Sequence, residues 1–407
     1  MYQSARVIVT VWALVVFGTV VSSALAADED RLLVINGLAE TLSLIDRAGD
    51  STVLTVQTLG LSPNEMEIAT DALLLTNSIS DNLWVLDRDT YAIIDIITFP
   101  DGDNPYDVAV IDDTLCAVSL TVANSVMLVN YATGDTLSRL PVGTSPQGLC
   151  VQDSLLWVAN TGFDYNTFMY GQGTVDVLDA ESGSAVVSID VGTNPQVIAE
   201  AADGSIHVLC TGNFFDQFGI VYVINSSSLA VEDSLALGGS PGDLVFTTDG
   251  IGYVAAGGWV DSGLVYRYDA LTRTVLNGVG NPWKTARGVI GVSPRLEGGV
   301  FAYCFSADSV IGHGLDGRIE EMYQVGDGPQ PGAHISNRRP GDVNDDGTVD
   351  AIDVNVLIDL LFFGGPMVPR PNAADLNHDC FHDAVDLNVL ISQAFFNGMI
   401  HYWGCAE

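Results

Sequence analysis

Short apolar runs followed by turn residues dominate the chain from about residue 31 to residue 335. Residues 73–77 (LLLTN) and 156–160 (LWVAN) are typical of these runs, which have the length and composition of β-strands. Gly, Pro, Asp and Asn separate them, and the 42 glycines of the chain fit many tight turns. The pattern therefore predicts many short strands over this region.

A proline recurs in this region at intervals of 41 to 49 residues. Each proline is followed by an apolar stretch, then by a second strand, and then by a third strand that ends in Asp or Asn. Four strands in a period of about 40–45 residues are typical of a β-propeller. The marks predict seven blades, with prolines at Pro63, Pro105, Pro146, Pro195, Pro241, Pro282 and Pro329, and strand ends at Asp46, Asp87, Asn130, Asp179, Asn225, Asp269 and Asp316.

The two ends of this region complement each other. Residues 31–36 match a second strand, and the first strand that they lack follows Pro329, near residues 332–335. One blade is then built from both ends, which removes the free sheet edges that promote aggregation. We therefore predict a mainly β fold over residues 27–335, a seven-bladed β-propeller closed by N- and C-terminal strands in one blade.

The charge of the chain excludes some classes of partner. Acidic residues outnumber basic ones 51 to 14, which gives a formal net charge of −37. Nucleic-acid binding needs clustered Lys and Arg, and so does electrostatic attachment to an anionic membrane. We expect neither. Only 16% of the residues are charged and 48% are apolar, so a large core is expected instead of a disordered acidic chain.

The first 26 residues have the features of a signal peptide. Arg6 supplies the positive end, residues 7–21 form an apolar run, and residues 24–26 (ALA) supply small residues for cleavage before Ala27. An uncleaved membrane anchor is the alternative, but the apolar run is short for a spanning helix. We expect a secreted protein, extracellular or associated with the cell surface, with no membrane span after signal cleavage.

The six cysteines fall into two groups. Cys380 and Cys405 lie close together near the C-terminus, where an exported protein can form a disulfide, and we expect this pair to form. None of the six has the CxxC spacing of a zinc site. The other four lie in apolar runs and are expected to be buried thiols of the core: Cys116, Cys150, Cys210 and Cys304.

A twelve-residue acidic loop at 342–353 (DVNDDGTVDAID) recurs 33 residues later at 375–386 (DLNHDCFHDAVD). Calcium takes six to eight oxygen ligands, and loops of this length supply them from positions 1, 3, 5, 7, 9 and 12. Two calcium ions are therefore expected. Their ligands would be Asp342, Asn344, Asp346, the Thr348 carbonyl, Asp350 and Asp353 in the first loop, and Asp375, Asn377, Asp379, the Phe381 carbonyl, Asp383 and Asp386 in the second.

An apolar helix is expected after each loop, at about 353–363 and 386–396. A loop and a helix, twice, with Asp at position 12, resemble a type I dockerin domain over residues 341–398, after a linker at 336–340 and before a tail at 399–407. The second copy departs from the family at Cys380 and His382.

The dockerin resemblance implies a module that calcium folds and that docks onto a cohesin-like domain of another protein. A module that packs on its own propeller, or only stabilises the C-terminus, is the alternative. The partner-binding residues implied by the resemblance are Ala351, Ile352, Ala384 and Val385.

Residues 31–335 resemble the bacterial propellers named for a Tyr-Val-Thr-Asn motif. The matching segments are 74–77 (LLTN), 157–160 (WVAN), 177–179 (VLD) and 191–195 (VGTNP). Propellers of this kind serve as surface proteins, binding platforms and occasionally enzymes, so the resemblance implies the fold and leaves the function open.

Enlarged loops rich in aromatic and acidic residues connect the second and third strands of three consecutive blades. Equivalent loops emerge on one face of a propeller, and an exposed aromatic patch usually marks a binding surface. Such a face could hold a carbohydrate or a protein, or its rings could pack beneath the loops as small cores. The candidate ligand face comprises Phe163, Asp164, Tyr165, Phe168, Tyr170, Phe214, Phe215, Asp216, Trp259, Asp261 and Trp283.

No catalytic residue can be nominated from the sequence. His207, His313 and His334 fall in unrelated positions, and Gly-x-Ser-x-Gly and nucleotide-binding motifs do not occur. We expect an exported, non-catalytic binding or scaffold protein, associated with polysaccharide. The alternatives are an extracellular propeller enzyme, lactonase-like or carbohydrate-active, delivered by its dockerin-like module, and a purely structural surface protein. Converging His, Arg and Glu at the central channel would favour the enzyme, whereas Gly, Ser and scattered Asp would favour binding.

Overall fold

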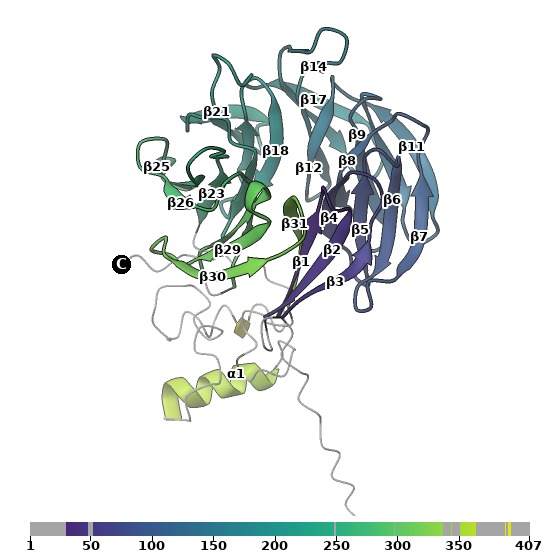
Figure 1. The fold of residues 1–407 in the computed structure, drawn as a ribbon. Coiled ribbons are helices and arrows are strands. Elements are labelled where there is room, and N and C mark those ends of the chain that lie inside the picture. Colours follow the sequence, from purple (N-terminus) through teal and green to yellow (C-terminus); the bar gives the residue numbers. More distant parts are fainter. Residues whose placement is uncertain are drawn as a thin grey trace, which may run out of the picture.

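The computed structural model describes residues 30–47, 52–247, 250–296, 298–336, 343, 351–363, 387 and 390–391. Over residues 30–336 their strands form seven antiparallel sheets arranged as the blades of a propeller (Figure 1). In blades 2 to 7 the chain runs outward from an inner strand, and in blade 1 the inner strand is the last strand of the propeller. The predicted seven-bladed architecture is confirmed.

The first four blades have the following strands. Blade 1 contains β31 (Pro329–Ser336), β1 (Asp30–Asn36), β2 (Thr41–Asp46) and β3 (Thr52–Thr58); blade 2 contains β4 (Pro63–Ile68), β5 (Ala72–Asn77), β6 (Asn82–Asp87) and β7 (Ile93–Thr98); blade 3 contains β8 (Pro105–Val110), β9 (Leu115–Leu120), β10 (Ser125–Asn130) and β11 (Asp135–Pro141); blade 4 contains β12 (Pro146–Gln152), β13 (Leu155–Asn160), β16 (Thr174–Asp179) and β17 (Ala185–Asp190). A small hairpin, β14 (Phe163–Asp164) and β15 (Met169–Tyr170), extends from blade 4.

The remaining three blades complete the ring. Blade 5 contains β18 (Pro195–Glu200), β19 (Ile206–Cys210), β20 (Ile220–Asn225) and β21 (Ala230–Ala236); blade 6 contains β22 (Asp243–Phe246), β23 (Ile251–Ala255), β24 (Gly263–Asp269), β25 (Thr274–Asn277) and β26 (Trp283–Thr285); blade 7 contains β27 (Val289–Pro294), β28 (Val300–Cys304), β29 (Ser309–His313) and β30 (Ile319–Gln324), with a short 3-10 helix, η1 (Phe305–Ala307), between β28 and β29.

The core lies between neighbouring blades. Alternate residues of each strand face the next sheet, so Trp157 and Val177 of blade 4 pack with Ile198 and Val208 of blade 5. The same arrangement recurs around the ring. The four cysteines expected in the core are free thiols, three of them buried and one half-buried: Cys116, Cys210, Cys304 and Cys150.

Blade 6 departs from the repeat predicted by the prolines. Pro282 was expected to precede an inner strand. The strand that follows it, β26, pairs instead with the first three residues of β24, Gly263 to Val265. Because β25 ends at Asn277, β26 takes over its place beside Gly263. The inner strand of blade 7 begins at Val289 instead. Pro282 therefore precedes a strand, as predicted, but this strand is an added strand of blade 6 and not the inner strand of blade 7.

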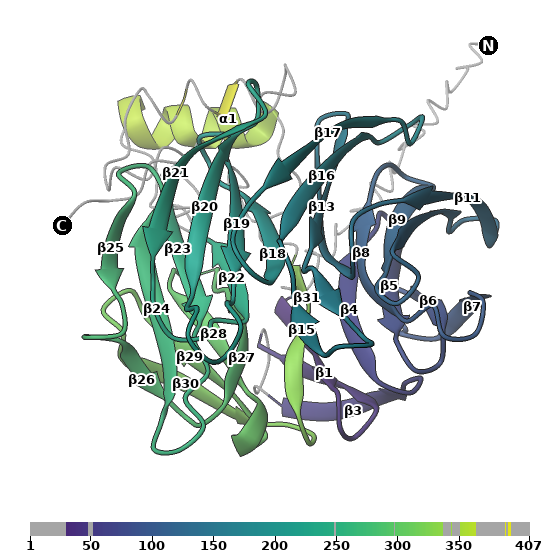
Figure 2. The ribbon, with the colours of Figure 1, turned by 90° about the horizontal axis from the view of Figure 1, so that it is seen from above.

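Blade 1 closes the ring as predicted. The inner strand β31 pairs with β1, and Ile335 lies opposite Arg31. Figures 1 and 2 show the light green β31 beside the purple β1, although nearly 300 residues separate them in the sequence.

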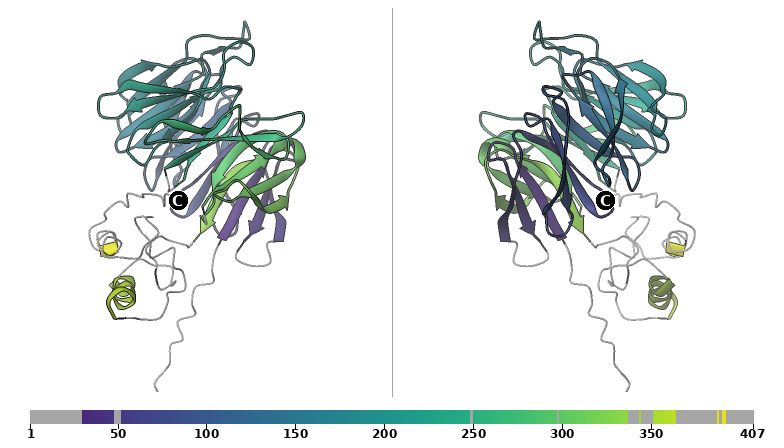
Figure 3. Two further views of the ribbon diagram at one scale, coloured as in Figure 1. Left: turned by 90° about the vertical axis from the view of Figure 1, so that its left-hand side faces the viewer. Right: turned by 90° about the vertical axis from the view of Figure 1, so that its right-hand side faces the viewer.

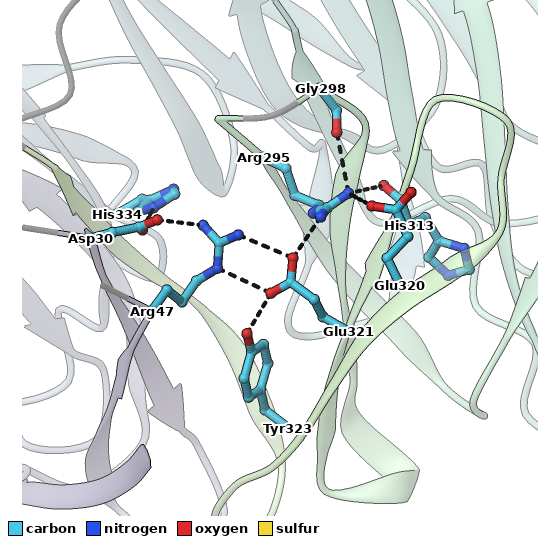
Figure 4. A network of polar contacts seen from close by, with 9 residues as sticks. All are labelled: Asp30, Arg47, Arg295, Gly298, His313, Glu320, Glu321, Tyr323 and His334. Carbon is cyan, nitrogen blue, oxygen red and sulfur yellow. Dashed lines mark hydrogen bonds and ion pairs between the residues drawn. The ribbon is translucent and has the colours of Figure 1, made fainter. Parts of the chain in front are cut away.

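A network of ion pairs crosses the seam between blade 1 and blade 7 (Figure 4). Arg47 of blade 1 donates to Asp30 Oδ2 at 2.8 Å and to both carboxylate oxygens of Glu321 in blade 7, at 3.0 and 3.1 Å. Arg295 Nη2 donates to the same Glu321 at 2.5 Å, and Tyr323 donates its hydroxyl hydrogen to it as well.

The two arginines of this network are almost closed to solvent. The side chains of Arg47 and Arg295 are 6% and 4% exposed. Both guanidinium groups lie near the ring of Phe301, the Cζ of Arg47 at 5.0 Å and that of Arg295 at 5.7 Å from its centre. Burial raises the pKa of Glu321, but hydrogen bonds from Arg47, Tyr323 and Arg295 outweigh it and lower the pKa to about 2. Glu321 is therefore the shared anion of the seam.

In the C-terminal region, α1 (Ala351–Ile358) continues into a short π-helical segment, η2 (Asp359–Phe363). Val343, which lies before α1, packs with Val354 and Leu357 of that helix and with Leu390. Leu357 and Leu390 occupy equivalent positions of the two sequence repeats, and both are fully buried. The two repeats therefore share one apolar core. In the part of the chain described here, no helix is long and apolar enough to cross a membrane.

Candidate functional site

A cavity of about 480 Å³ opens where the inner strands of the blades converge. The repeat explains its lining, because the second residue after a blade's proline faces it in several blades. Glu65, Asp107 and Asp243 occupy this position in blades 2, 3 and 6, and Gly148 and Val197 occupy it in blades 4 and 5. The wall therefore carries carboxylates on some sides and small or apolar residues on others.

Two of these carboxylates also join neighbouring blades. Asp107 Oδ2 accepts a hydrogen bond from the backbone N–H of Leu149, the fourth residue of the next inner strand, at 2.7 Å. Asp243 Oδ2 accepts one from Val292 at 2.8 Å in the same way. Each Asp thus has a structural role that explains its position. The other oxygen, Oδ1, accepts a hydrogen bond from the next residue of the same strand, Val108 for Asp107 and Leu244 for Asp243. Main-chain donors therefore satisfy both oxygens of each carboxylate without neutralising its charge.

The electrostatics of the wall are unfavourable for several negative charges. Burial raises the pKa of Asp243 to about 6, and it raises that of Asp107 to about 7, where the charge of Asp243 adds to it. Burial, followed by the charges of Asp107 and Asp243, raises the pKa of Glu65 well above its usual value. These carboxylates lack the solvation that they have in water.

The predicted aromatic loops form a cluster on the face where the inner strands begin. The hairpin of β14 and β15 projects from this end of the propeller (Figures 1 and 3). The ring of Phe163 lies 5.0 Å from Tyr165 and 5.0 Å from Tyr170, centre to centre, and 6.2 Å from Phe168. Tyr170 in turn lies 6.3 Å from Phe214, so the cluster reaches from blade 4 to blade 5.

Several of these rings are open to solvent. Phe168 is 73% exposed, Phe214 61%, Phe215 84% and Trp259 56%. Such exposure on a folded chain is typical of a recognition surface. Phe214 and Trp259 also line the cavity, together with Tyr106. We call Tyr106, Phe214 and Trp259 the rim, because they join the exposed patch to the acidic interior.

The acidic residues predicted in the loops have local roles. Asp164 accepts hydrogen bonds from the backbone and side chain of Asn166, which hold the hairpin turn, and these bonds lower its pKa. Asp216 accepts from Asn213 Nδ2 at 2.7 Å within its own loop. Asp261 is exposed.

Trp283 does not belong to the rim. Its ring stacks on His313 at 5.9 Å and lies 5.6 Å from Tyr253, because β26 pairs with β24 and directs the ring between blades 6 and 7. The cavity carboxylates Glu65, Asp107 and Asp243, by contrast, were not among the predicted site residues. Their common spacing from the blade prolines was a signal that could have found them.

Asp353, the twelfth position of the first predicted calcium loop, lies at the start of α1 and is fully buried. Its Oδ1 accepts a hydrogen bond from the backbone N–H of Val343 at 2.8 Å, so the carboxylate is turned toward the loop. A buried carboxylate in this position fits a loop that wraps around a cation. Ala351 and Ile352 are exposed on the same helix.

The other predicted residues of this region lie outside the described residues. Among those that are described, no three His, Cys, Asp or Glu side chains are grouped to hold a metal. The predictions outside are the calcium ligands Asp342, Asn344, Asp346, Thr348, Asp350, Asp375, Asn377, Asp379, Phe381, Asp383 and Asp386, the contact residues Ala384 and Val385, and the Cys380–Cys405 pair.

Comparisons with known proteins agree with this architecture. The propeller is similar to a chain of Kuenenia stuttgartiensis hydrazine synthase, with a TM-score of 0.55 and 16% identity over 65% of this chain and 87% of that one. It is also similar to a functionally unknown protein from Desulfotomaculum acetoxidans, with a TM-score of 0.57 and 14% identity over 75% of this chain and 98% of that one. At these identities the likeness concerns the fold alone.

A comparison with curated proteins found no match. The family comparison was specific for the C-terminal region, where residues 340–393 match the dockerin type I domain. The chain therefore combines a seven-bladed β-propeller with a C-terminal dockerin type I domain.

Proposed function

We propose that this is an exported, non-catalytic binding protein, secreted or held at the cell surface. Its propeller recognises a ligand on the rim and the aromatic patch, and its dockerin domain attaches it to a cohesin-like partner when calcium is bound. One observation carries the attachment: the dockerin match covers the segment in which Leu357 and Leu390, from the two repeats, share a core.

The residues of the module support a role for calcium. When bound, calcium would supply the positive charge that lets several loop carboxylates lie together. Asp353 would hold the end of the first loop, and its bond to Val343 would couple the loop to the shared core. The apolar side chain of Ile352 is 54% exposed and would contact the partner.

The test is calcium-dependent capture of purified type I cohesin domains by the full chain. Capture is expected with calcium and is expected to be lost in chelator. Asp353→Ala should weaken capture at least tenfold, because it removes a ligand and a bond of the loop. Asp359→Ala is the matched control, since Asp359 is exposed on the following turn. Capture that persists in chelator, or that responds equally to both variants, would contradict the proposal.

The cavity supports binding as the role of the propeller. Its lining combines carboxylates with Gly148, Gly242 and Ser240, which is the combination expected of a binding channel. Two of the carboxylates already accept main-chain hydrogen bonds from the next blade.

A carbohydrate-active enzyme is the second candidate. It is favoured by one observation, the raised pKa values of Asp107 and Asp243 on one cavity wall, because general acids in glycoside hydrolysis have raised pKa values. Hydrolysis of oligosaccharides by the full chain, abolished by Asp107→Asn, would favour the enzyme over the binding protein.

A further inference from the structure

The cavity and its rim have a chemistry that is specific enough to name a ligand class. Three carboxylates, those of Glu65, Asp107 and Asp243, face one space of about 480 Å³. Among the described residues that line this space there is no Lys, Arg or His. The cavity therefore gathers three acidic groups with no cationic side chain among these lining residues to compensate their charge when they ionise.

The rim adds aromatic faces to this potential. Tyr106, Phe214 and Trp259 line the opening, and the last two expose more than half of their side-chain surface. Aromatic faces attract cations through the negative charge of the ring face, and a guanidinium also stacks on them. An aromatic opening above a carboxylate wall fits a long side chain that ends in a cation.

We propose that the propeller binds a peptide segment that inserts an arginine side chain into this cavity. The proposal rests on the proposed function of the propeller as a recognition platform, and it adds the class of its ligand. The guanidinium would lie near Glu65, whose carboxylate faces the cavity, and the side-chain stem would pass between Phe214 and Trp259. Main-chain atoms of the peptide would contact the exposed aromatic patch beyond the rim.

Desolvation of the carboxylates supports a cation over a neutral ligand. Burial and the neighbouring carboxylates make their negative charges costly, as the raised pKa values of Asp107 and Glu65 indicate. A bound guanidinium offsets this cost, whereas a sugar hydroxyl brings no charge. The exposed rings of Phe168 and Phe215 extend the apolar surface past the cavity, which favours a peptide over a small free cation.

The experiment is calorimetric titration of the full chain, at constant calcium, with the peptide acetyl-Gly-Gly-Arg-Gly-Gly-amide. Its control is the same peptide with citrulline, which has nearly the shape of arginine and no charge. The arginine peptide is expected to bind at least tenfold more tightly than the citrulline peptide. Equal affinity for the two peptides, or no binding of either, would overturn the proposal.

Two variants locate the site. Glu65→Gln keeps the shape of the side chain but removes the carboxylate that would pair with the guanidinium, and it should weaken the binding of the arginine peptide about tenfold. Trp259→Ala removes an exposed ring of the rim and should weaken the binding of both peptides. Glu181→Gln is the matched control, because Glu181 is exposed in an outer turn of blade 4, and it should leave binding unchanged. An equal effect of Glu65→Gln and Glu181→Gln would contradict the assignment.

Two further ligands distinguish an arginine peptide from other possible occupants of the cavity. Agmatine carries the same guanidinium without a peptide and should bind more weakly, because it leaves the patch uncovered; equal affinity would overturn the peptide as the occupant. The other ligand is a neutral oligosaccharide. If it bound in a Trp259-dependent manner and the arginine peptide did not bind, the proposal of a cationic ligand would be wrong, and the propeller would still be a binding platform. Cohesin capture tests the dockerin domain independently of all these outcomes.

Discussion

The seam between blades 1 and 7 offers a quantitative test of how this ring is held closed. Glu321→Gln keeps the shape of the side chain and removes the negative charge shared by Arg47 and Arg295. Both guanidiniums are nearly buried, so the loss of a shared anion leaves positive charge without part of its compensation. We expect the variant to be less stable than the native chain.

The magnitude follows from the pKa of Glu321. A decrease from 4.5 to about 2 corresponds to about 3 kcal/mol, at 1.36 kcal/mol for each pKa unit. The side chain is 20% exposed, so solvent screening reduces this to about 2 kcal/mol. This loss of stability is below the 3–5 kcal/mol expected when a buried ion pair is fully broken. The reason is that Arg47 retains its ion pair with Asp30, and Arg295 retains its ion pair with Glu320, each at 2.8 Å.

The assay is denaturant unfolding of the propeller at a series of pH values. A carboxyl group with a lowered pKa contributes stability above its unfolded pKa, and this contribution is lost as the pH falls toward its folded pKa. The difference between native chain and variant should therefore be constant above about pH 5 and should shrink toward pH 2. Glu232→Gln is the control, because it breaks an exposed ion pair with Arg273, and it should cost less than about 0.5 kcal/mol.

Two results would refute this reasoning. If Glu321→Gln cost no more than Glu232→Gln, the network would not stabilise the seam. If the difference between native chain and variant were unchanged between pH 5 and pH 2, the stabilisation would not come from the charge of Glu321.

Three further predictions concern other parts of the molecule. Gly263→Ala should destabilise blade 6 by more than 1 kcal/mol, because its added methyl would lie 1.9 Å from a main-chain oxygen. Gly280→Ala is the control, since its methyl would enter open space, and thermal unfolding should show no change for it. Chelation of calcium should reduce the far-UV helical signal and expose the C-terminal region to protease while the propeller stays folded; unchanged helicity would exclude a metal-coupled fold. Binding of the arginine peptide should strengthen as the pH rises through about 6 to 7, where Asp243 and Asp107 ionise, and a calorimetric pH series that showed no such rise would exclude their role.

The aromatic face was predictable in part. Large rings in equivalent loops of consecutive blades have to emerge together, and the contact between Tyr170 and Phe214 confirms that they do. Trp283 was assigned to the same face because it lies beside a blade proline, Pro282, but its strand pairs with β24 and the ring is directed between blades. Sequence spacing alone does not show which edge of a sheet a short strand will occupy.

The sequence by itself determined the repeat, the number of blades, the closing blade and the paired acidic loops. These features depend on local alternation, turn chemistry and spacing, all of which are written along the chain. Only the tertiary structure decided that Glu65, Asp107 and Asp243 face one cavity, and that Arg47, Arg295 and Glu321 meet at a seam. Residues from separate blades become neighbours only when the ring closes, since the distance between them is set by the geometry of the blades and not by their separation along the chain.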